Sequence, residues 1–125
     1  MSRNEISLKV IINDEVLFQS NRKWIHPIFD FEDFLKINPL KLNNVKIYDK
    51  VVGKAAALLL FRLGVVWIHG EVMSELAVNA LTQWRVKFAY DELVKRIDCK
   101  TEKILFEVNE PEIAYSILCK RANRC

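Results

Sequence analysis

Glycine and proline are scarce in this chain, which has only 3 of each among its 125 residues. Both residues are typical of turns and irregular loops, so their scarcity favours compact helices and strands joined by short connections. Hydrophobic residues make up 51% and charged residues 28%, which is the composition of a folded chain rather than a disordered one. We therefore expect one domain that spans residues 1–125.

Long apolar runs are also lacking. The longest run, from Ala55 to Phe61, is too short to cross a membrane, and residues 1–5 do not begin a signal peptide. The formal net charge is only +3, and the densest basic cluster is a small one at 120–124. These features predict a cytoplasmic protein without a membrane partner, and they do not favour nucleic acid as a partner.

The cysteines do not form a metal-binding pattern. Cys99, Cys119 and Cys125 are odd in number and lack metal-finger spacing, so we expect free thiols and no metal or other cofactor. Cys99 lies in a polar stretch next to Lys100, which favours a thiolate, and it is a candidate reactive thiol. A nucleophile also needs a base, and nothing in the sequence places a histidine beside it.

The apolar pattern predicts alternating strands and helices. The expected strands are 6–12 and 15–20, joined as a hairpin, then 45–48, 65–68 and 86–90, with 104–108 as either one more strand or an irregular connection. The expected helices are 27–37, a central helix within 48–64, 75–83, 91–97 and 111–121, and 98–103 is expected to be a loop. Ser74 is the expected N-cap of its helix. This order predicts an α/β fold, a three-layer α/β/α sandwich whose mixed sheet has an N-terminal antiparallel hairpin followed by parallel strands.

The central helix is the most informative stretch. It is apolar on almost every side, which predicts burial, and Gly64 is its expected end. Asp49, Lys50 and Lys54 are expected in its first turn, where backbone N–H groups lack partners and the helix dipole is positive. Gly53 is interpreted as a point of close approach by another segment.

Ligands of α/β sheets gather outside the carboxyl ends of parallel strands. Here those ends deliver residues 48–54 and 69–75, so two lysines and a serine can hold a phosphate or carboxylate while glutamates orient a polar group. The candidate ligand-binding residues are Asp49, Lys50, Gly53, Lys54, Glu71, Ser74 and Glu75. His69 is interpreted as a hydrogen-bonded residue at a strand end. Trp24, Trp67 and Trp84 are expected in the core or an interface, because no basic groove interleaves with them.

The run Tyr48-Asp49-Lys50-Val51-Val52-Gly53-Lys54-Ala55-Ala56-Ala57, with 64–65, 70–77 and the region of Cys99 and Glu102, resembles an uncharacterised bacterial family of domains of unknown function. Members of that family look like cytidine deaminases in fold, so the resemblance implies a deaminase-like fold. A zinc deaminase needs His-x-Glu or Cys-x-Glu at the start of the central helix and Pro-Cys-x-x-Cys at the start of the next one. This chain has neither motif at 49–54 or 73–77, so zinc-dependent deamination is not expected.

Three functions remain open. The first is a non-catalytic, deaminase-like domain that binds a small polar or anionic, nucleotide-like ligand, or a protein partner, at the strand ends. The second is an enzyme of unknown reaction that uses Cys99 or the carboxylates of Asp49, Glu71 and Glu75. The third is a structural module that forms a homodimer.

Overall fold

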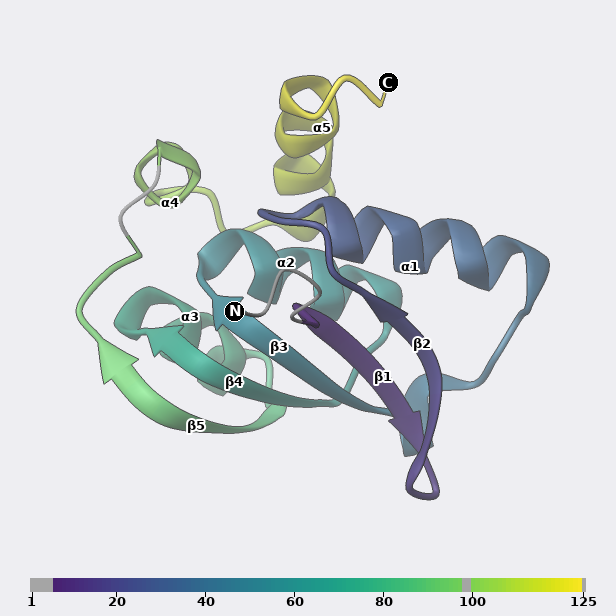
Figure 1. Ribbon diagram of the computed structural model, residues 1–125. Coiled ribbons are helices and arrows are strands. Elements are labelled where there is room, and N and C mark those ends of the chain that lie inside the picture. Colours follow the sequence, from purple (N-terminus) through teal and green to yellow (C-terminus); the bar gives the residue numbers. More distant parts are fainter. Residues whose placement is uncertain (1–5, 98–99, 125) are drawn as a thin grey trace.

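The computed structural model describes residues 6–97 and 100–124, which form a mixed sheet and a set of helices (Figure 1). In chain order the elements are β1 (Leu8–Ile12), β2 (Glu15–Ser20), α1 (His26–Ile37), the 3-10 turn η1 (Leu42–Asn44), β3 (Lys46–Val52), α2 (Lys54–Leu63), β4 (Trp67–Ser74), α3 (Glu75–Gln83), β5 (Lys87–Val94), α4 (Lys100–Ile104) and α5 (Pro111–Arg121). The five strands lie in the order β2-β1-β3-β4-β5. Strand β1 is antiparallel to both of its neighbours, whereas β3, β4 and β5 are parallel.

The helices of the described residues form one layer, not two. Helices α1, α3, α4 and α5 all contact α2, which lies against the sheet behind β3 and β4 (Figure 1). The prediction of helices on both faces is therefore wrong for the part of the chain that the structure describes. The reason is topological, because β3-α2-β4 and β4-α3-β5 step across the sheet in the same direction. Right-handed crossovers that step the same way put their helices on the same face.

The alternation along the strands agrees with this two-layer arrangement. Leu8, Val10 and Ile47 point toward the helices and are fully buried, whereas Lys9 and Tyr48 point to the other face and are exposed. One face of the sheet is therefore open to solvent over the described residues.

The central helix begins later than expected. Strand β3 continues to Val52, Gly53 is the N-cap, and α2 starts at Lys54. Asp49 and Lys50 therefore lie in a strand, and the prediction that they occupy the first turn of the helix is wrong. Val51 and Val52 are β-branched and pair with the neighbouring strand β4, which favours the extended backbone. The predicted burial is confirmed, because every residue from 54 to 60 is buried.

The later boundaries agree in part with the sequence pattern. The cap of α3 is confirmed, since the Ala77 N–H donates to Ser74 Oγ at 3.1 Å. A helix at 91–97 is not observed, because β5 pairs with β4 as far as Val94. Of the two alternatives for 104–108, the strand is not observed, and the chain instead makes an irregular connection after α4 ends at Ile104. Cys119 in α5 is disulfide-bonded, which corrects the expectation of a free thiol there, and Cys99 and Cys125 lie outside the described residues. Within the described residues, no helix is long and apolar enough to cross a membrane.

Candidate functional site

The structure divides the predicted site residues among three places. Gly53, Lys54 and Ser74 meet at a buried junction where α2 and α3 begin. Glu75 lines a pocket at the carboxyl ends of β4 and β5. The remaining candidates line a hollow on the open face of the sheet, and they are Asp49, Lys50 and Glu71.

The buried junction is organised around Glu102 of α4, which is only 3% exposed. Its Oε2 accepts hydrogen bonds from the Lys54 backbone N–H at 2.9 Å and from Ser74 Oγ at 2.6 Å. Its Oε1 accepts one from the Ile97 backbone N–H at 2.6 Å. One carboxylate thus holds the starts of α2 and α3 and the segment that follows β5. Negative charge is favoured at helix N-termini because they present unpaired N–H groups and the positive end of the dipole.

Lys54 is part of the same junction and is not available to a ligand. Its ammonium donates hydrogen bonds to the Phe106 carbonyl and to Asn109 Oδ1, both at 2.9 Å, and the residue is 4% exposed. Burial lowers the pKa of Lys54, and the nearby Glu102 charge opposes that shift. The lysine therefore ties the connection between α4 and α5 to the start of α2. The partners of the ammonium are thus two neutral oxygens, and the anion of this junction, Glu102, is bound by the backbone N–H of Lys54 instead.

Gly53 leaves the space that this contact needs. A Cβ at Gly53 would stand 3.0 Å from Glu102 Oε2 and 3.1 Å from Ile97 Cγ1. The close approach predicted from the sequence is therefore made by two side chains. Sequence reasoning did not identify Glu102 as the acceptor, because its neighbours in the chain do not reveal that it reaches two helix starts.

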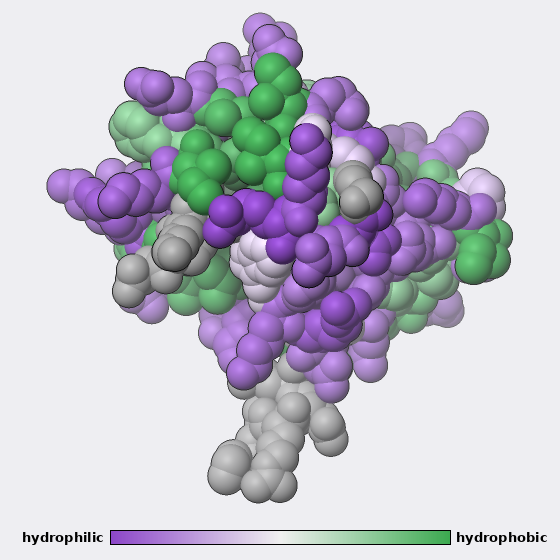
Figure 2. Space-filling model, turned by 90° about the horizontal axis from the view of Figure 1, so that it is seen from above, coloured by the Kyte–Doolittle hydropathy of each residue, from purple (hydrophilic) through white to green (hydrophobic). Residues whose placement is uncertain are grey.

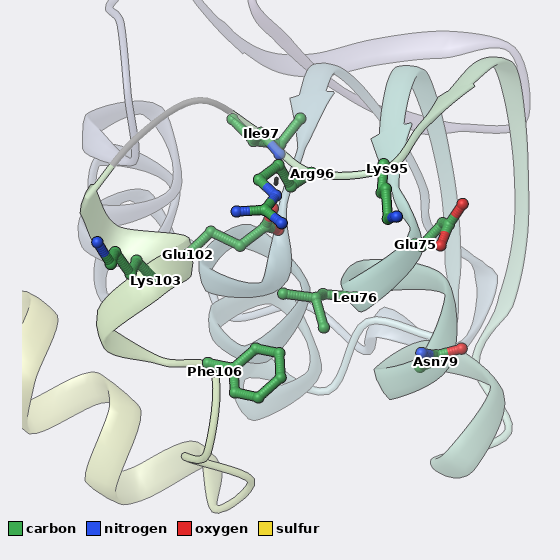
Figure 3. Close-up of a pocket in the computed structure, with 9 residues that line it drawn as sticks. All are labelled: Glu75, Leu76, Asn79, Lys95, Arg96, Ile97, Glu102, Lys103 and Phe106. Atoms are coloured by element: carbon green, nitrogen blue, oxygen red, sulfur yellow. Dashed lines mark hydrogen bonds between the residues drawn. The ribbon is translucent and has the colours of Figure 1, made fainter.

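The pocket at the strand ends has a volume of about 470 Å³. Figure 3 shows its walls: Leu76 and the Phe106 ring lie below the cationic heads of Arg96 and Lys95 in this view. Asn79 supplies an amide at the lower rim (Figure 3). The remaining lining residues are Glu75, Ile97, Glu102 and Lys103.

The pocket combines apolar walls with free positive charge. The side chains of Arg96 and Lys95 make no ion pair, within the residues the structure describes. Phe106 is 61% exposed and Ile104 and Ile113 are also exposed. The side that carries α4 and α5 shows a hydrophobic area bordered by hydrophilic side chains (Figure 2). An apolar wall beside unpaired cations suits a ligand with both a ring and an anionic group.

The hollow on the open face has a volume of about 400 Å³ and contains the sheet residues of the prediction. His69 Nε2 lies 2.9 Å from Asp91 Oδ1, so this histidine has a partner, as expected, although it lies inside β4 rather than at its end. Burial raises the pKa of Asp49 to about 7, and backbone hydrogen bonds from Val51 and Lys50 oppose the shift.

Asp49 and Glu71 line this hollow while Glu75 lines the pocket at the strand ends. The three carboxylates of the enzyme hypothesis therefore do not form one site.

No group of three or more His, Cys, Asp or Glu side chains suited to holding a metal ion occurs in residues 6–97 and 100–124.

Comparisons with known proteins give a family and a fold. A family model described as TM1506, a domain of unknown function (DUF1893), matches residues 1–121. The structure is similar to the crystal structure of a DUF1893 family protein (TM1506) from Thermotoga maritima, with 25% sequence identity and a TM-score of 0.81. The similarity covers 93% of this chain and 80% of that one. No curated protein matches the chain. Neither description names a ligand, a partner or a reaction.

Proposed function

The chain belongs to the DUF1893 family of domains of unknown function, and we propose that it is a binding domain for a small anionic, nucleotide-like ligand. The ligand occupies the pocket between α3, α4 and the segment after β5. The observation that carries this proposal is the cavity of about 470 Å³ at the carboxyl ends of two parallel strands. Its size is typical of small-molecule sites, and ligands of α/β sheets gather at such ends.

The lining supports a ligand with two chemically different parts. The Phe106 ring and the Leu76 side chain offer an apolar surface for a flat ring. The Arg96 guanidinium and the Lys95 ammonium offer donors to a phosphate or carboxylate. Glu75 repels a second anionic group and accepts a hydrogen bond from a ligand hydroxyl or amino group. A nucleoside monophosphate is the simplest probe with these properties.

A binding function is favoured over catalysis at the buried junction because its polar groups are already used. Glu102 accepts three hydrogen bonds, and the Lys54 ammonium donates two. Ser74 Oγ donates to Glu102 and caps α3. A general base or a nucleophile works best when its reacting atom is free to meet the substrate. Here each polar atom of these three side chains already makes at least one hydrogen bond inside the protein.

We also infer a deaminase-like fold for this domain. The supporting feature is the meeting of the starts of α2 and α3, since these are the two places where a zinc deaminase carries its ligands. Here the Glu102 carboxylate joins the two helix starts, through the Lys54 N–H and the Ser74 hydroxyl. We propose that this internal carboxylate holds the two starts together in place of a metal ion.

The binding proposal is tested by calorimetric titration with nucleoside monophosphates, and with inorganic phosphate and uncharged nucleosides as single-part probes. We expect binding of the monophosphates and weaker binding of either part alone. Arg96→Gln should weaken binding at least about tenfold, because a hydrogen bond to a charged group is worth about 1.5–3 kcal/mol. Phe106→Ala should weaken binding of the nucleoside as well as the monophosphate.

The matched control is Lys36→Gln, which removes an exposed positive charge from α1, away from the pocket. Its affinity should equal that of the unmodified protein. Equal weakening by Lys36→Gln and Arg96→Gln would mean that the anion is attracted by net charge alone. Absence of binding for every probe, with a folded protein, would overturn the proposal.

A further inference from the structure

The open face of the sheet carries a row of aromatic side chains at the beginning of the parallel strands. Tyr48 of β3 pairs with His69 of β4, and their rings stack at a centroid distance of 5.1 Å. Trp67 lies two residues before His69, with its ring 6.1 Å from the His69 ring. Tyr48 is 38% exposed. Three rings therefore stand together on a face that no helix of the described chain covers.

Lysines surround these rings. Lys9 pairs with Tyr48 across β1 and β3, and Lys87 pairs with Trp67 across β4 and β5. The Lys46 ammonium lies 5.5 Å from the centre of the Trp67 ring. None of these three lysines makes an ion pair in the described part of the chain. Basic side chains thus interleave with Trp67, which corrects the sequence-based view that none do.

Acidic residues of this face come after the aromatic row, in the direction of the carboxyl ends of β4 and β5. Glu71 and Asp91 follow His69 and Ala89 along β4 and β5, and Asp91 is held by His69. The face therefore has a basic, aromatic end at the start of β3, β4 and β5 and an acidic end toward their carboxyl ends. The two ends adjoin, because Lys9 and Tyr48 share the open-face hollow with Glu71 and Asp91. A polyanion is therefore attracted to the side of Lys46, Trp67 and Lys87, away from these carboxylates.

We propose that this basic, aromatic end of the open sheet face binds single-stranded nucleic acid. Bases stack on the exposed ring of Tyr48 and on the half-buried ring of Trp67, and phosphates lie against Lys9, Lys46 and Lys87. Flat rings bordered by lysines are the combination that binds single strands without reading their sequence. The site is separate from the pocket between α3 and α4, so the proposal does not rest on the proposed function.

A second copy of this chain is a less suitable occupant. In a symmetric dimer the same surface meets itself, so the three lysines of one copy would face those of the other. Like charges brought together in an interface are unfavourable. The acidic residues of the open-face hollow are Asp49, Glu71 and Asp91, and Asp91 is already held by His69. Charge complementarity favours a polyanion with flat rings.

The experiment is fluorescence anisotropy with a labelled oligouridine of about 10 nucleotides, which is within the range that one such domain covers. Tyr48→Ala and Trp67→Ala should each weaken binding at least about fivefold, the loss expected when a base stack is removed. Each phosphate contact contributes about −0.7 to the slope of log affinity against log salt for single strands, so Lys87→Gln should make the slope shallower by about 0.7. Circular dichroism checks that each variant is folded.

The control variants are Trp24→Ala and Lys36→Gln, which remove a 43% exposed tryptophan and an exposed lysine at or near α1. Both should bind oligouridine as the unmodified protein does. The proposal is overturned if the unmodified protein does not bind at about 50 mM salt. It is also overturned if a duplex of equal length binds as tightly, or if Tyr48→Ala and Trp67→Ala leave affinity unchanged. Sedimentation of the unmodified protein as a dimer that Trp67→Ala dissociates would assign the face to a second copy instead.

Discussion

The buried junction around Glu102 and the open face of the sheet contain similar residue types in opposite circumstances. At the junction a glutamate and a lysine are almost inaccessible, and each of their side-chain oxygen and nitrogen atoms has a hydrogen-bond partner inside the protein. On the open face Lys9, Lys46 and Lys87 have no ion-pair partner within the described residues. The difference shows that a charged residue near a helix start does not mark a ligand site when other groups of the protein already bind that residue.

This comparison also separates structural from functional roles. Charges at the junction should contribute to the free energy of unfolding, because buried polar groups are costly once a partner is lost. Charges on the open face should contribute little to it, because solvent and salt screen them. Four substitutions test this contrast, beginning with the largest expected effect.

Glu102→Ala should lower the free energy of unfolding by about 3–5 kcal/mol, since it leaves the Lys54 N–H, the Ile97 N–H and the Ser74 hydroxyl without their acceptor. Urea denaturation measures the change. Glu107→Ala, an exposed glutamate after the same helix, is the matched control and should alter the stability by less than about 0.5 kcal/mol. Similar effects of the two variants would remove the distinction between the junction and the surface.

Lys54→Ala should cost about 2–3 kcal/mol, because the Phe106 carbonyl and Asn109 Oδ1 both lose a charged donor. The loss is expected to be local, so hydrogen exchange of backbone amides between 105 and 109 should accelerate more than exchange in the sheet. Lys36→Ala is the control for the removal of a lysine. Uniform acceleration across the whole chain would show that Lys54 does not act through this connection.

Asp49→Asn tests a carboxyl group that lines the hollow on the open face. Burial raises the pKa of Asp49 from 3.8 to about 7, so the folded protein retains a proton that the unfolded chain releases above its lower pKa. The stabilising contribution is therefore complete below the unfolded pKa of 3.8 and is lost as the pH rises through about 7.

Asparagine keeps an oxygen that accepts the backbone hydrogen bonds but carries no charge at any pH. We expect the variant to be more stable than the unmodified protein by about 1–2 kcal/mol at pH 8, below the limit of about 4 kcal/mol that the full shift would give. The gain should disappear near pH 4. Urea denaturation across this range measures it, and an unchanged pH dependence would show that Asp49 is solvated like a surface carboxyl.

Lys46→Gln should have the smallest effect on stability, about 0.5 kcal/mol, which is the value of an exposed cation–π contact such as that with Trp67. Thermal unfolding is sufficient to measure it. A loss above about 1.5 kcal/mol would mean that this lysine is part of a packed surface, and the open face would then resemble the junction.

Local features of the fold were predictable because their causes lie within a few residues. The Ser74 cap, the end of α2 at Gly64 and the helix Pro111–Arg121 each follow from a side chain, a flexible backbone or an apolar spacing in the segment itself. The start of α2 was not predictable in the same way. Residues 49–52 precede a strongly helical run, and pairing with β4 on one side and with the β1 side of the sheet on the other draws them into a strand.

The candidate site shows the same limit. The strand ends and helix starts identify the residues that approach one another, but not the group that joins them. Glu102 follows Lys54 by 48 positions, so their contact depends on how α4 returns to the start of α2. The prediction of a second helical layer was wrong for a related reason. A sequence pattern shows which segments are helices, but it does not show the direction in which successive crossover connections step across the sheet.

The sequence alone therefore determined the apolar central helix, the alternation of strands and helices and the absence of the zinc-deaminase motifs. The tertiary structure decided which charges are buried, which face of the sheet is open, and where a cavity forms. The physical reason is that periodicity, caps and β-branched residues act on the neighbouring backbone. Burial and charge pairing instead depend on segments that lie far apart in the chain and meet only in the folded protein.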